Sequence, residues 1–390
     1  MALEGFGSSS SFGFGQTIYR VTNLNTSGAG SLADAVSADN RFIIFQTSGT
    51  IEQDAHITIS GDNLTIAGQT APYPGIQLKD CNVWITGHDV LLQHIRIRTG
   101  DDIGENYDAM NIQPGAYNVV VDHCSIQWGI DECAGISESV DTHDITFSYC
   151  LVAEGLHDSI HTSGVHSMGM ILASDLENIS VIRCLLAHNN SRNPRLAADS
   201  TGEVINCITY NSGTNNIYIS GGDAAPGDWS IRQNHTIQGL DGGDDELYHF
   251  TVIATTIDGT DIYYDEGIHD LLPASGLRDL DGNVDWLGSA NIDSGATILE
   301  ATGNIVYDHV LKYVGAWPVN RDSVDLRIIA DVRNGTGNII DSQDDVGGWP
   351  VYAVNSRVLS SIPATEQGQK DWLAFYSRVV EEGTANALFF

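Results

Sequence analysis

VVVDHCSIQ at residues 119–127 is a strand-like run whose pattern returns three times along the chain. The later copies are ITFSYCLVA at 145–153, ISVIRCLLA at 179–187 and EVINCITY at 203–210. Each copy is short, rich in β-branched residues and bounded by Gly, Asn, Asp or Ser, which is typical of strands separated by turns. Each copy also carries one cysteine, and successive cysteines are 26, 34 and 23 residues apart. This spacing favours a solenoid, in which equivalent residues of successive coils lie one above another.

The four cysteines are interpreted as structural. In a solenoid they would form a buried stack of small apolar side chains, namely Cys124, Cys150, Cys184 and Cys207. A metal site is not favoured, because the sequence has no pair of cysteines with two residues between them. Disulfides along the stack are left open. Cys81 and Cys133 fall outside the repeat.

The rest of the chain supports one elongated domain. Earlier strand-like runs are LTIAG at 64–68, VWITG at 83–87 and VLLQHIRIR at 90–98. A length of 390 residues is long for one compact domain, but a solenoid buries its core coil against coil. Helical patterns are sparse, near 31–39 and 371–383, where short helices would cap the ends. We therefore predict a single all-β domain over 1–390, with an N-terminal cap region at 1–45 and a helical or extended tail at about 355–390.

The charge balance excludes two classes of partner. Asp and Glu number 51 against 17 Lys and Arg, and the net charge is −34. Such a surface repels nucleic acid and anionic membranes, so neither is an expected partner. No apolar run is long enough for a transmembrane helix. The first fifteen residues lack the basic and apolar regions of a signal peptide, so no leader is expected within this chain.

Six phrases, in their order along the chain, resemble bacterial extracellular pectate lyases of the family 1 polysaccharide lyase type. They are YRVTNLNTSGAGSLADAV, FQTSGTI, LTIAGQTAPYPGIQL, VVVDHCSIQWGIDE, HNNSRNPR and DVRNGTGNIIDSQDDVGGWP, and the similarity runs from about residue 5 to about residue 352. The resemblance implies a right-handed parallel β-helix, which agrees with the repeats. It also implies de-esterified pectin as substrate, Ca²⁺ as cofactor and a secreted protein. We expect a monomer.

The resemblance places a Ca²⁺ site on two segments. YDAMNI points to Asp108, and WGIDECAGI points to Glu132 with Asp131 beside it. Ca²⁺ is a hard cation that binds several oxygen ligands in irregular geometry, so carboxylates suit it. Many members of the family have another acid where this chain has Ile136. A nearby acidic turn contains Asp101, Asp102 and Glu105, which could assist in binding Ca²⁺. The favoured interpretation of each of the three is an exposed residue without such a role.

SRNPRLA at 191–197 resembles the family's Arg-x-Pro-x-x-Arg signature. Arg192 then corresponds to the base that removes a proton from the substrate. The second arginine of the signature falls on Ala197, so Arg195 is the candidate for binding a substrate carboxylate. An arginine normally keeps its proton at neutral pH, so a base role predicts activity that rises in alkaline solution.

Three histidines cluster in GLHDSIHTSGVHSMG at 155–169. Related sequences often have a lysine where this chain has Ser163. His161 and His166 are therefore candidates for substrate binding, although a structural role is the simpler interpretation of each, as it is of His157. Trp128 and Tyr210 are candidates for lining a sugar-binding groove, with burial in the core as the alternative for both.

These residues together predict cleavage of polygalacturonate by Ca²⁺-assisted β-elimination, giving 4,5-unsaturated oligogalacturonides. Two alternatives stay open at this point. A β-helix hydrolase acting on a uronic-acid polysaccharide would need two carboxylates as acid and base, and only Asp101 and Asp102 form an adjacent pair in a plausible place. A carbohydrate-binding protein without activity, such as a phage tailspike, would explain the missing family residues.

Overall fold

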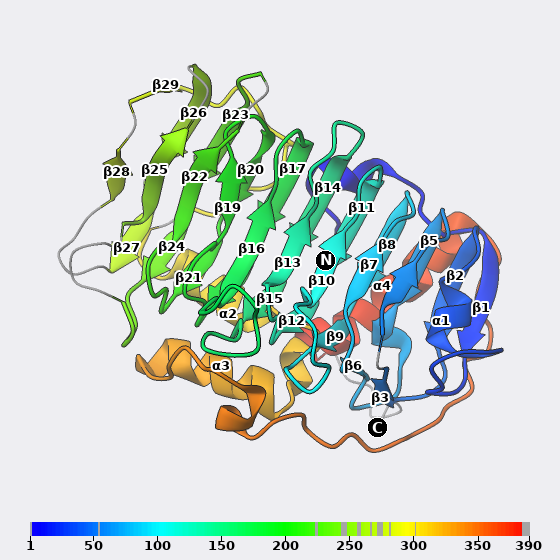
Figure 1. Cartoon of the computed structure of the whole chain (residues 1–390). Helices are drawn as coiled ribbons and strands as arrows, with labels where there is room; N and C mark the ends of the chain where they lie inside the picture. Colours follow the sequence, from blue (N-terminus) through cyan, green and yellow to red (C-terminus); the bar gives the residue numbers. More distant parts are fainter. Residues whose placement is uncertain are drawn as a thin grey trace.

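The computed structural model describes residues 2–53, 55–222, 225–242, 248–255, 259–265, 267–270, 276–280, 282–300 and 302–383. Met1 and residues 384–390, which the predicted domain includes, lie outside the described residues. The strands of the described part coil into an elongated parallel β-helix with three sheets (Figure 1). The predicted all-β parallel β-helix is confirmed.

Each coil contributes one strand to each sheet. Sheet I consists of β1 (Thr17–Val21), β2 (Arg41–Phe45), β5 (Leu64–Ala67), β8 (Val90–Gln93), β11 (Tyr117–Asp122), β14 (His143–Ser148), β17 (Glu177–Ile182), β20 (Thr201–Ile205), β23 (Asp228–Arg232), β26 (Thr260–Asp265) and β29 (Val284–Trp286). Sheet II consists of β4 (Ile57–Ile59), β7 (Val83–Ile85), β10 (Met110–Ile112), β13 (Glu132–Ile136), β16 (Met168–Leu172), β19 (Arg195–Ala197), β22 (Ile217–Gly221), β25 (Phe250–Thr255) and β28 (Leu277–Asp279). Sheet III consists of β3 (Gly49–Glu52), β6 (Ile76–Lys79), β9 (Ile95–Arg98), β12 (Ser125–Gln127), β15 (Leu151–Ala153), β18 (Leu185–Ala187), β21 (Ile208–Tyr210), β24 (His235–Ile237) and β27 (Ile268–Asp270).

Parallel pairing keeps the coils in register and builds the core. In sheet I, for example, Phe147 pairs with Val121 on one side and with Val181 on the other. Inward-facing apolar side chains from all three sheets form one continuous buried cluster. The predicted cysteine stack lies in this core, and all six cysteines are buried and free. A single residue with positive φ turns the chain from sheet I to sheet III, as at His94, His123 and Tyr149.

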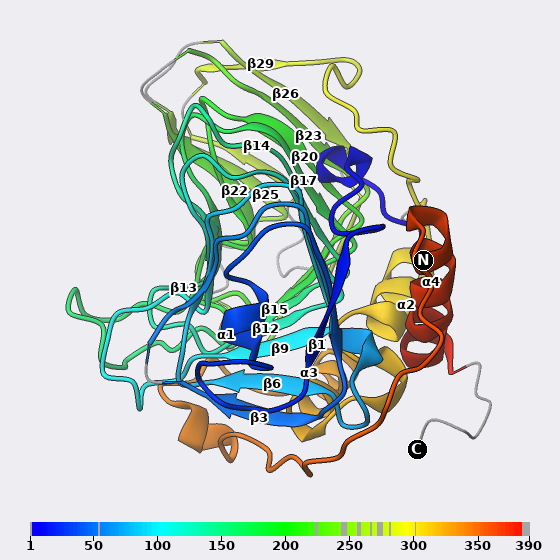
Figure 2. The same ribbon diagram turned by 90° about the vertical axis from the view of Figure 1, so that its right-hand side faces the viewer.

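Helices cover the N-terminal end and one side of the coil. They are α1 (Leu32–Ala35), α2 (Ile305–Tyr313), α3 (Ser323–Asn334) and α4 (Glu366–Glu382), with 3₁₀ turns η1 (Phe6–Ser9), η2 (Gly68–Thr70), η3 (Pro318–Asn320) and η4 (Gln343–Val346). Figure 2 shows α2, α3 and α4 along the side of sheet III and its corner with sheet I, away from sheet II. None of the helices in the described ranges is both long and apolar enough to span a membrane.

Both predicted helical segments contain a helix, since α1 lies within 31–39 and α4 covers most of 371–383. Helices α2 and α3 were not predicted. The buried face of α3 mixes apolar side chains with Asp325, which obscures its helical pattern. Asp325 is fully buried and accepts hydrogen bonds from Arg98, Ser125 and Gln127 at 2.7–3.0 Å. Sheet III thus meets α3 through a buried polar network as well as through apolar contacts.

This network gives a test of how the helices are attached. We expect Asp325→Ala to lower the free energy of unfolding by about 3–5 kcal/mol, because it leaves the buried Arg98 guanidinium short of a partner. The neighbouring Leu326 is 55% exposed, so Leu326→Ala should change stability by no more than about 0.5 kcal/mol. Chemical denaturation of the two variants measures both effects. Equal stability of the two variants would contradict the role given to Asp325.

Candidate active site

The candidate site lies on sheet II, where three carboxylates from two successive coils come together. Asp108 precedes β10, Asp131 precedes β13, and Glu132 begins β13. Each of the three offers an oxygen, and these oxygens all lie within 4.8 Å of one another. Parallel pairing explains the meeting, because Met110 of β10 is in register with Ala134 of β13. The structure therefore brings together all three predicted metal ligands.

Asp108 is held by hydrogen bonds on both oxygens. The backbone N–H of Glu132 donates to Oδ1 at 3.0 Å, and Asn111 Nδ2 donates to Oδ2 at 2.6 Å. Asn111 is itself fixed, since its Oδ1 accepts a hydrogen bond of 2.7 Å from Ser137. Gly135 leaves room for it, because a Cβ at that position would lie 2.8 Å from Asn111 Nδ2. The carboxylate of Asp108 consequently has one fixed orientation.

Burial and charge act differently on the two aspartates. Burial raises the pKa of Asp108 to about 7, and the Asp131 carboxylate adds to the rise. Burial alone would also raise the pKa of Asp131, but contacts with His166 and His161 hold it below its ordinary value. His166 Nε2 lies 2.7 Å from Asp131 Oδ1, and His161 Nε2 lies 3.7 Å from Oδ2. A buried carboxyl next to an ionised one is a site that favours a cation.

Arg192 reaches this cluster from two strands away. It lies just before β19, separated from β13 by β16, and its guanidinium forms an ion pair with Glu132. Two strand spacings amount to about 10 Å, which the extended arginine and glutamate side chains can bridge together. The backbone of Arg192 has φ +60°, and its carbonyl accepts a hydrogen bond of 2.6 Å from the Met170 N–H.

Asn193 anchors the segment that presents Arg192. Its side chain is fully buried and donates to Ser212 Oγ and to the carbonyl of Asn215 at 3.1 and 3.0 Å. The unfavourable backbone conformation of Arg192 is thus maintained by the surrounding hydrogen bonds. These bonds aim the guanidinium at the carboxylates.

Arg195, the other predicted arginine, lies on the same face. Its Nε donates to Ser220 Oγ at 3.1 Å, and its pKa is lowered by burial. Arg195 is in register with Ile171, which is in register with Gly135. It therefore lies two strands along the sheet from β13, which carries Glu132 of the carboxylate cluster.

The predicted histidines divide between two places. The rings of His161 and His166 are stacked with centroids 3.8 Å apart, and both contact Asp131. His157 instead lies 3.8 Å from Asp341. Ser163, which replaces a lysine of the family, belongs to the exposed part of this loop. Both predicted substrate-binding histidines are thus at the carboxylate cluster.

Two aromatic candidates are not part of this face. Trp128 and Tyr210 are fully buried under α2 and α3, where they donate hydrogen bonds to Glu154 and to the carbonyl of Thr336. Their assignment to a sugar-binding groove is wrong, and the alternative of burial is confirmed. In the acidic turn, Asp101 accepts a hydrogen bond from Gln343, whereas Asp102 and Glu105 are exposed.

Other residues of this face were missed. Trp84 of β7 is in register with Asn111 and stacks on His56, with ring centroids 3.7 Å apart. Asn111 and Trp84 are both signalled by the alternation of their short strands, which places them opposite the inward-facing residues. Asn193 carried no such signal, because its role depends on a loop of the next coil.

The raised pKa of Asp108 predicts a dependence of stability on pH in chelator. An unfolded aspartate titrates near 3.9, so between about pH 4 and pH 7 the folded chain keeps a proton that the unfolded chain releases. Stability should therefore fall as pH rises through this range. Asp108→Asn should remove that part of the fall, measured as Tm against pH for both proteins in chelator. Parallel curves for the two proteins would contradict the assignment.

Comparison with known proteins agrees with the fold and the sequence phrases. No family model matches the chain. A protein named "Probable pectate lyase C" from Aspergillus oryzae is 33% identical over 364 residues, covering 88% of this chain and 80% of the relative. Its namesake from Aspergillus fumigatus is 34% identical over 365 residues, with the same coverage. These relatives are fungal, whereas the resemblance of the sequence phrases was to bacterial enzymes.

Solved structures share the fold at low sequence identity. A pectate lyase bound to a hexasaccharide superposes with a TM-score of 0.57 at 14% identity, covering 81% of this chain and 97% of that one. A Bacillus subtilis pectate lyase variant gives 0.56 at 14% identity, covering 82% and 98%. These matches concern the fold, and the fungal relatives establish the family. On the identity and coverage of those relatives, the chain belongs to the pectate lyase family.

Proposed function

We propose that this chain cleaves polygalacturonate by β-elimination, with Ca²⁺ held by Asp108, Asp131 and Glu132 and with Arg192 facing the C5 proton. One observation carries the proposal. Three carboxylates from two coils gather against an arginine from a third coil. A hydrolase would need two carboxylates free to act as acid and base. Here Glu132 is paired with Arg192, and Asp108 is tied on both oxygens.

The donor set suits Ca²⁺ chemically. All three groups are carboxylates, and Ca²⁺ accepts several oxygens at irregular angles. Ile136 is buried in the core, so the described structure has no fourth acid there. When bound, Ca²⁺ would supply positive charge beside the uronate carboxylate, which acidifies the C5 proton. Asn111 and the backbone N–H of Glu132 keep Asp108 aimed at the site.

Arg192 is proposed to act on the substrate in the elimination step. The unprotonated guanidine takes the C5 proton, the electrons of the C5–H bond form the C4–C5 double bond, and the C4–O4 bond breaks. The departing oxygen gains a proton from water. Because arginine normally keeps its proton, the rate should rise toward alkaline pH.

The neighbouring residues would position the sugar chain. Arg195 lies two strands from the cluster and can bind a uronate carboxylate with its planar guanidinium. His161 and His166 contact Asp131, and their side chains, which are 7% and 14% exposed, would orient that carboxylate beside the substrate. We further propose that the 390 residues form one domain that acts as a secreted monomer. With a net charge of −34, cations in the medium must screen its repulsion of a polyanion.

The direct test is ultraviolet absorbance of the unsaturated product with polygalacturonate and Ca²⁺ at alkaline pH. We expect Arg192→Ala to lower kcat about 10³-fold, because the group facing the proton is lost. Arg20 is an exposed arginine of β1 in sheet I, so Arg20→Ala should leave activity unchanged. New reducing ends without a rise in absorbance would indicate a hydrolase. No product from this or other uronans would indicate a binding protein.

A second test addresses the support of Asp108. We expect Asn111→Ala to weaken Ca²⁺ binding about 10–100-fold, because it removes the hydrogen bond that orients a ligand. Calorimetric titration with Ca²⁺ measures the change. Thr58→Ala, an exposed position on β4 of the same sheet, serves as the control. Unchanged Ca²⁺ affinity in Asn111→Ala would place the cation elsewhere.

A further inference from the structure

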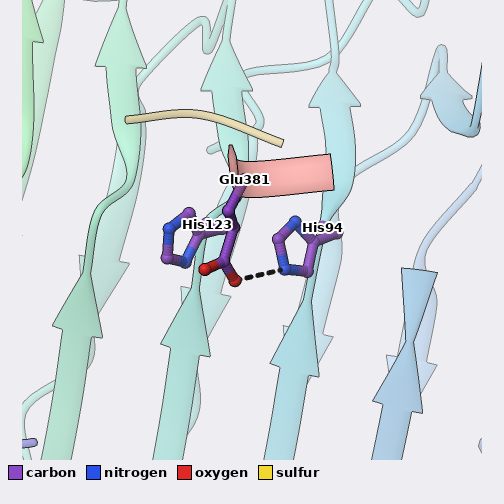
Figure 3. A group of neighbouring side chains, drawn as sticks. All are labelled: His94, His123 and Glu381. Carbon is purple, nitrogen blue, oxygen red and sulfur yellow. Dashed lines mark ion pairs between the residues drawn. The ribbon is translucent and has the colours of Figure 1, made fainter. Parts of the chain in front are cut away.

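Three buried side chains meet at the corner between sheets I and III, on the side of the coil away from the candidate active site. His94 follows β8, His123 follows β11 on the next coil, and Glu381 lies in the last turn of α4. Their exposed fractions are 0%, 1% and 1%. Figure 3 shows the carboxylate of Glu381 between the two imidazole rings.

Contacts at Nδ1 favour the same tautomer in both rings. Nδ1 of His94 lies 2.7 Å from the carbonyl oxygen of Ala316, which can only accept, so Nδ1 carries the proton. Nδ1 of His123 lies 2.9 Å from Asp122 Oδ1 in an ion-pair contact, and the negative charge there favours a proton on that nitrogen also. In each ring Nε2 is then left with its lone pair directed into the corner. Among the described residues neither Nε2 has a hydrogen-bond partner.

The two Nε2 atoms, which can only accept hydrogen bonds in this tautomer, lie beside the carboxylate of Glu381. Nε2 of His94 lies 3.4 Å from Glu381 Oε1, and one donor atom from each of the three residues lies within 4.8 Å of the others. Two partnerless imidazole nitrogens that lie beside a carboxylate, away from water, favour a cation between them. The cation can be a proton or a metal ion.

The surroundings of His123 resemble the support of a metal ligand. Asp122 is fixed by Gln93 Nε2 at 2.8 Å and by Ser148 Oγ at 2.7 Å. A carboxylate that holds Nδ1 and leaves Nε2 for a metal is the usual outer partner of a ligating histidine. Burial lowers the pKa of His94, which favours its neutral, ligating form.

We propose that His94, His123 and Glu381 bind a transition-metal ion such as Zn²⁺, which fastens the C-terminal helix to the β-helix. Two imidazole nitrogens and one carboxylate oxygen suit Zn²⁺, whereas Ca²⁺ prefers oxygen ligands. The rings are 5.0 Å apart and 19° from parallel, so they must turn toward Glu381 to share one ion. The site would clamp α4 to two coils that lie far from it in sequence.

A proton is the competing cation. Burial by itself would lower the pKa of His123, but Asp122 and Glu381 outweigh it and hold that pKa above its ordinary value. A protonated His123 would satisfy the same carboxylates without a metal. The two explanations differ in their response to added Zn²⁺, and this difference defines the experiment.

The experiment uses the full chain, stripped with chelator and returned to Ca²⁺-free buffer at neutral pH. Titration with Zn²⁺, followed by calorimetry and elemental analysis, should give one tight site in the wild type. Saturating Zn²⁺ should raise Tm by about 5 °C. His123→Gln and Glu381→Gln should each lose the tight site and the rise in Tm. Co²⁺ added to the wild type should give the visible absorption of a four-coordinate ion, a result that does not depend on any variant folding.

The matched control separates this site from the carboxylate cluster, which also contains histidines. The double variant His161→Gln/His166→Gln removes those rings and should keep both the tight Zn²⁺ site and the rise in Tm. Absence of tight Zn²⁺ binding by the wild type would overturn the proposal and leave the proton as the cation. Loss of binding in the double variant, or its survival in both His123→Gln and Glu381→Gln, would also overturn it.

Discussion

Parallel, in-register pairing of successive coils is the interaction on which the rest of this structure depends. It places Val121, Phe147 and Val181 side by side in the core and repeats that pairing along three sheets. It also sets the distances between polar groups on the outer faces. Asp108 and Glu132 lie close together because Asp108 precedes β10 and Glu132 begins β13, the neighbouring strand of sheet II. A slip of one residue in either strand would turn these side chains to the other face.

The same pairing builds two different polar clusters, one on sheet II and one at the corner of sheets I and III. On sheet II, carboxylates from two coils meet Arg192 from a third coil, and Asp131 and Arg192 of this group are partly exposed. At the corner of sheets I and III, His94 and His123 stack on successive coils and are sealed by α4. The β-helix therefore carries one partly exposed cluster and one buried cluster. The first has three carboxylates with His161 and His166 beside them, whereas the second has two imidazoles and one carboxylate.

The fold could be predicted from the sequence because a solenoid shows the same residue pattern in successive coils. Each run such as 145–153 shows β-branched residues, a corner residue and an inward cysteine, and the parallel coils confirm that pattern. Helix α3 was missed because Asp325 interrupts its apolar face. Asp325 is buried there because it accepts a hydrogen bond from Arg98, which is distant in sequence. The assignment of Trp128 and Tyr210 to a groove also failed because of contacts distant in sequence, since only the packing of α2 and α3 shows that they are covered.

For the candidate site, the resemblance supplied Asp108, Glu132 and Arg192, and the structure brings them together. Their roles stay predictions. Asn111 and Gly135 could not be linked to Asp108 from the sequence, because their meeting depends on the register between β10 and β13. Asn193 depends similarly on loop residues of the following coil. Sequence patterns thus identified charged groups, whereas the residues that hold them became apparent only from three-dimensional contacts.

The most direct measurement is a crystal structure of the Arg192→Ala variant with Ca²⁺ and an oligogalacturonate. The account predicts a cation bound by Asp108, Asp131 and Glu132 and in contact with a uronate carboxylate. It also predicts that C5 of that uronate faces the position vacated by the Arg192 side chain, with Arg195 near a neighbouring carboxylate. A sugar chain bound away from sheet II, or a cation held by other residues, would contradict the account.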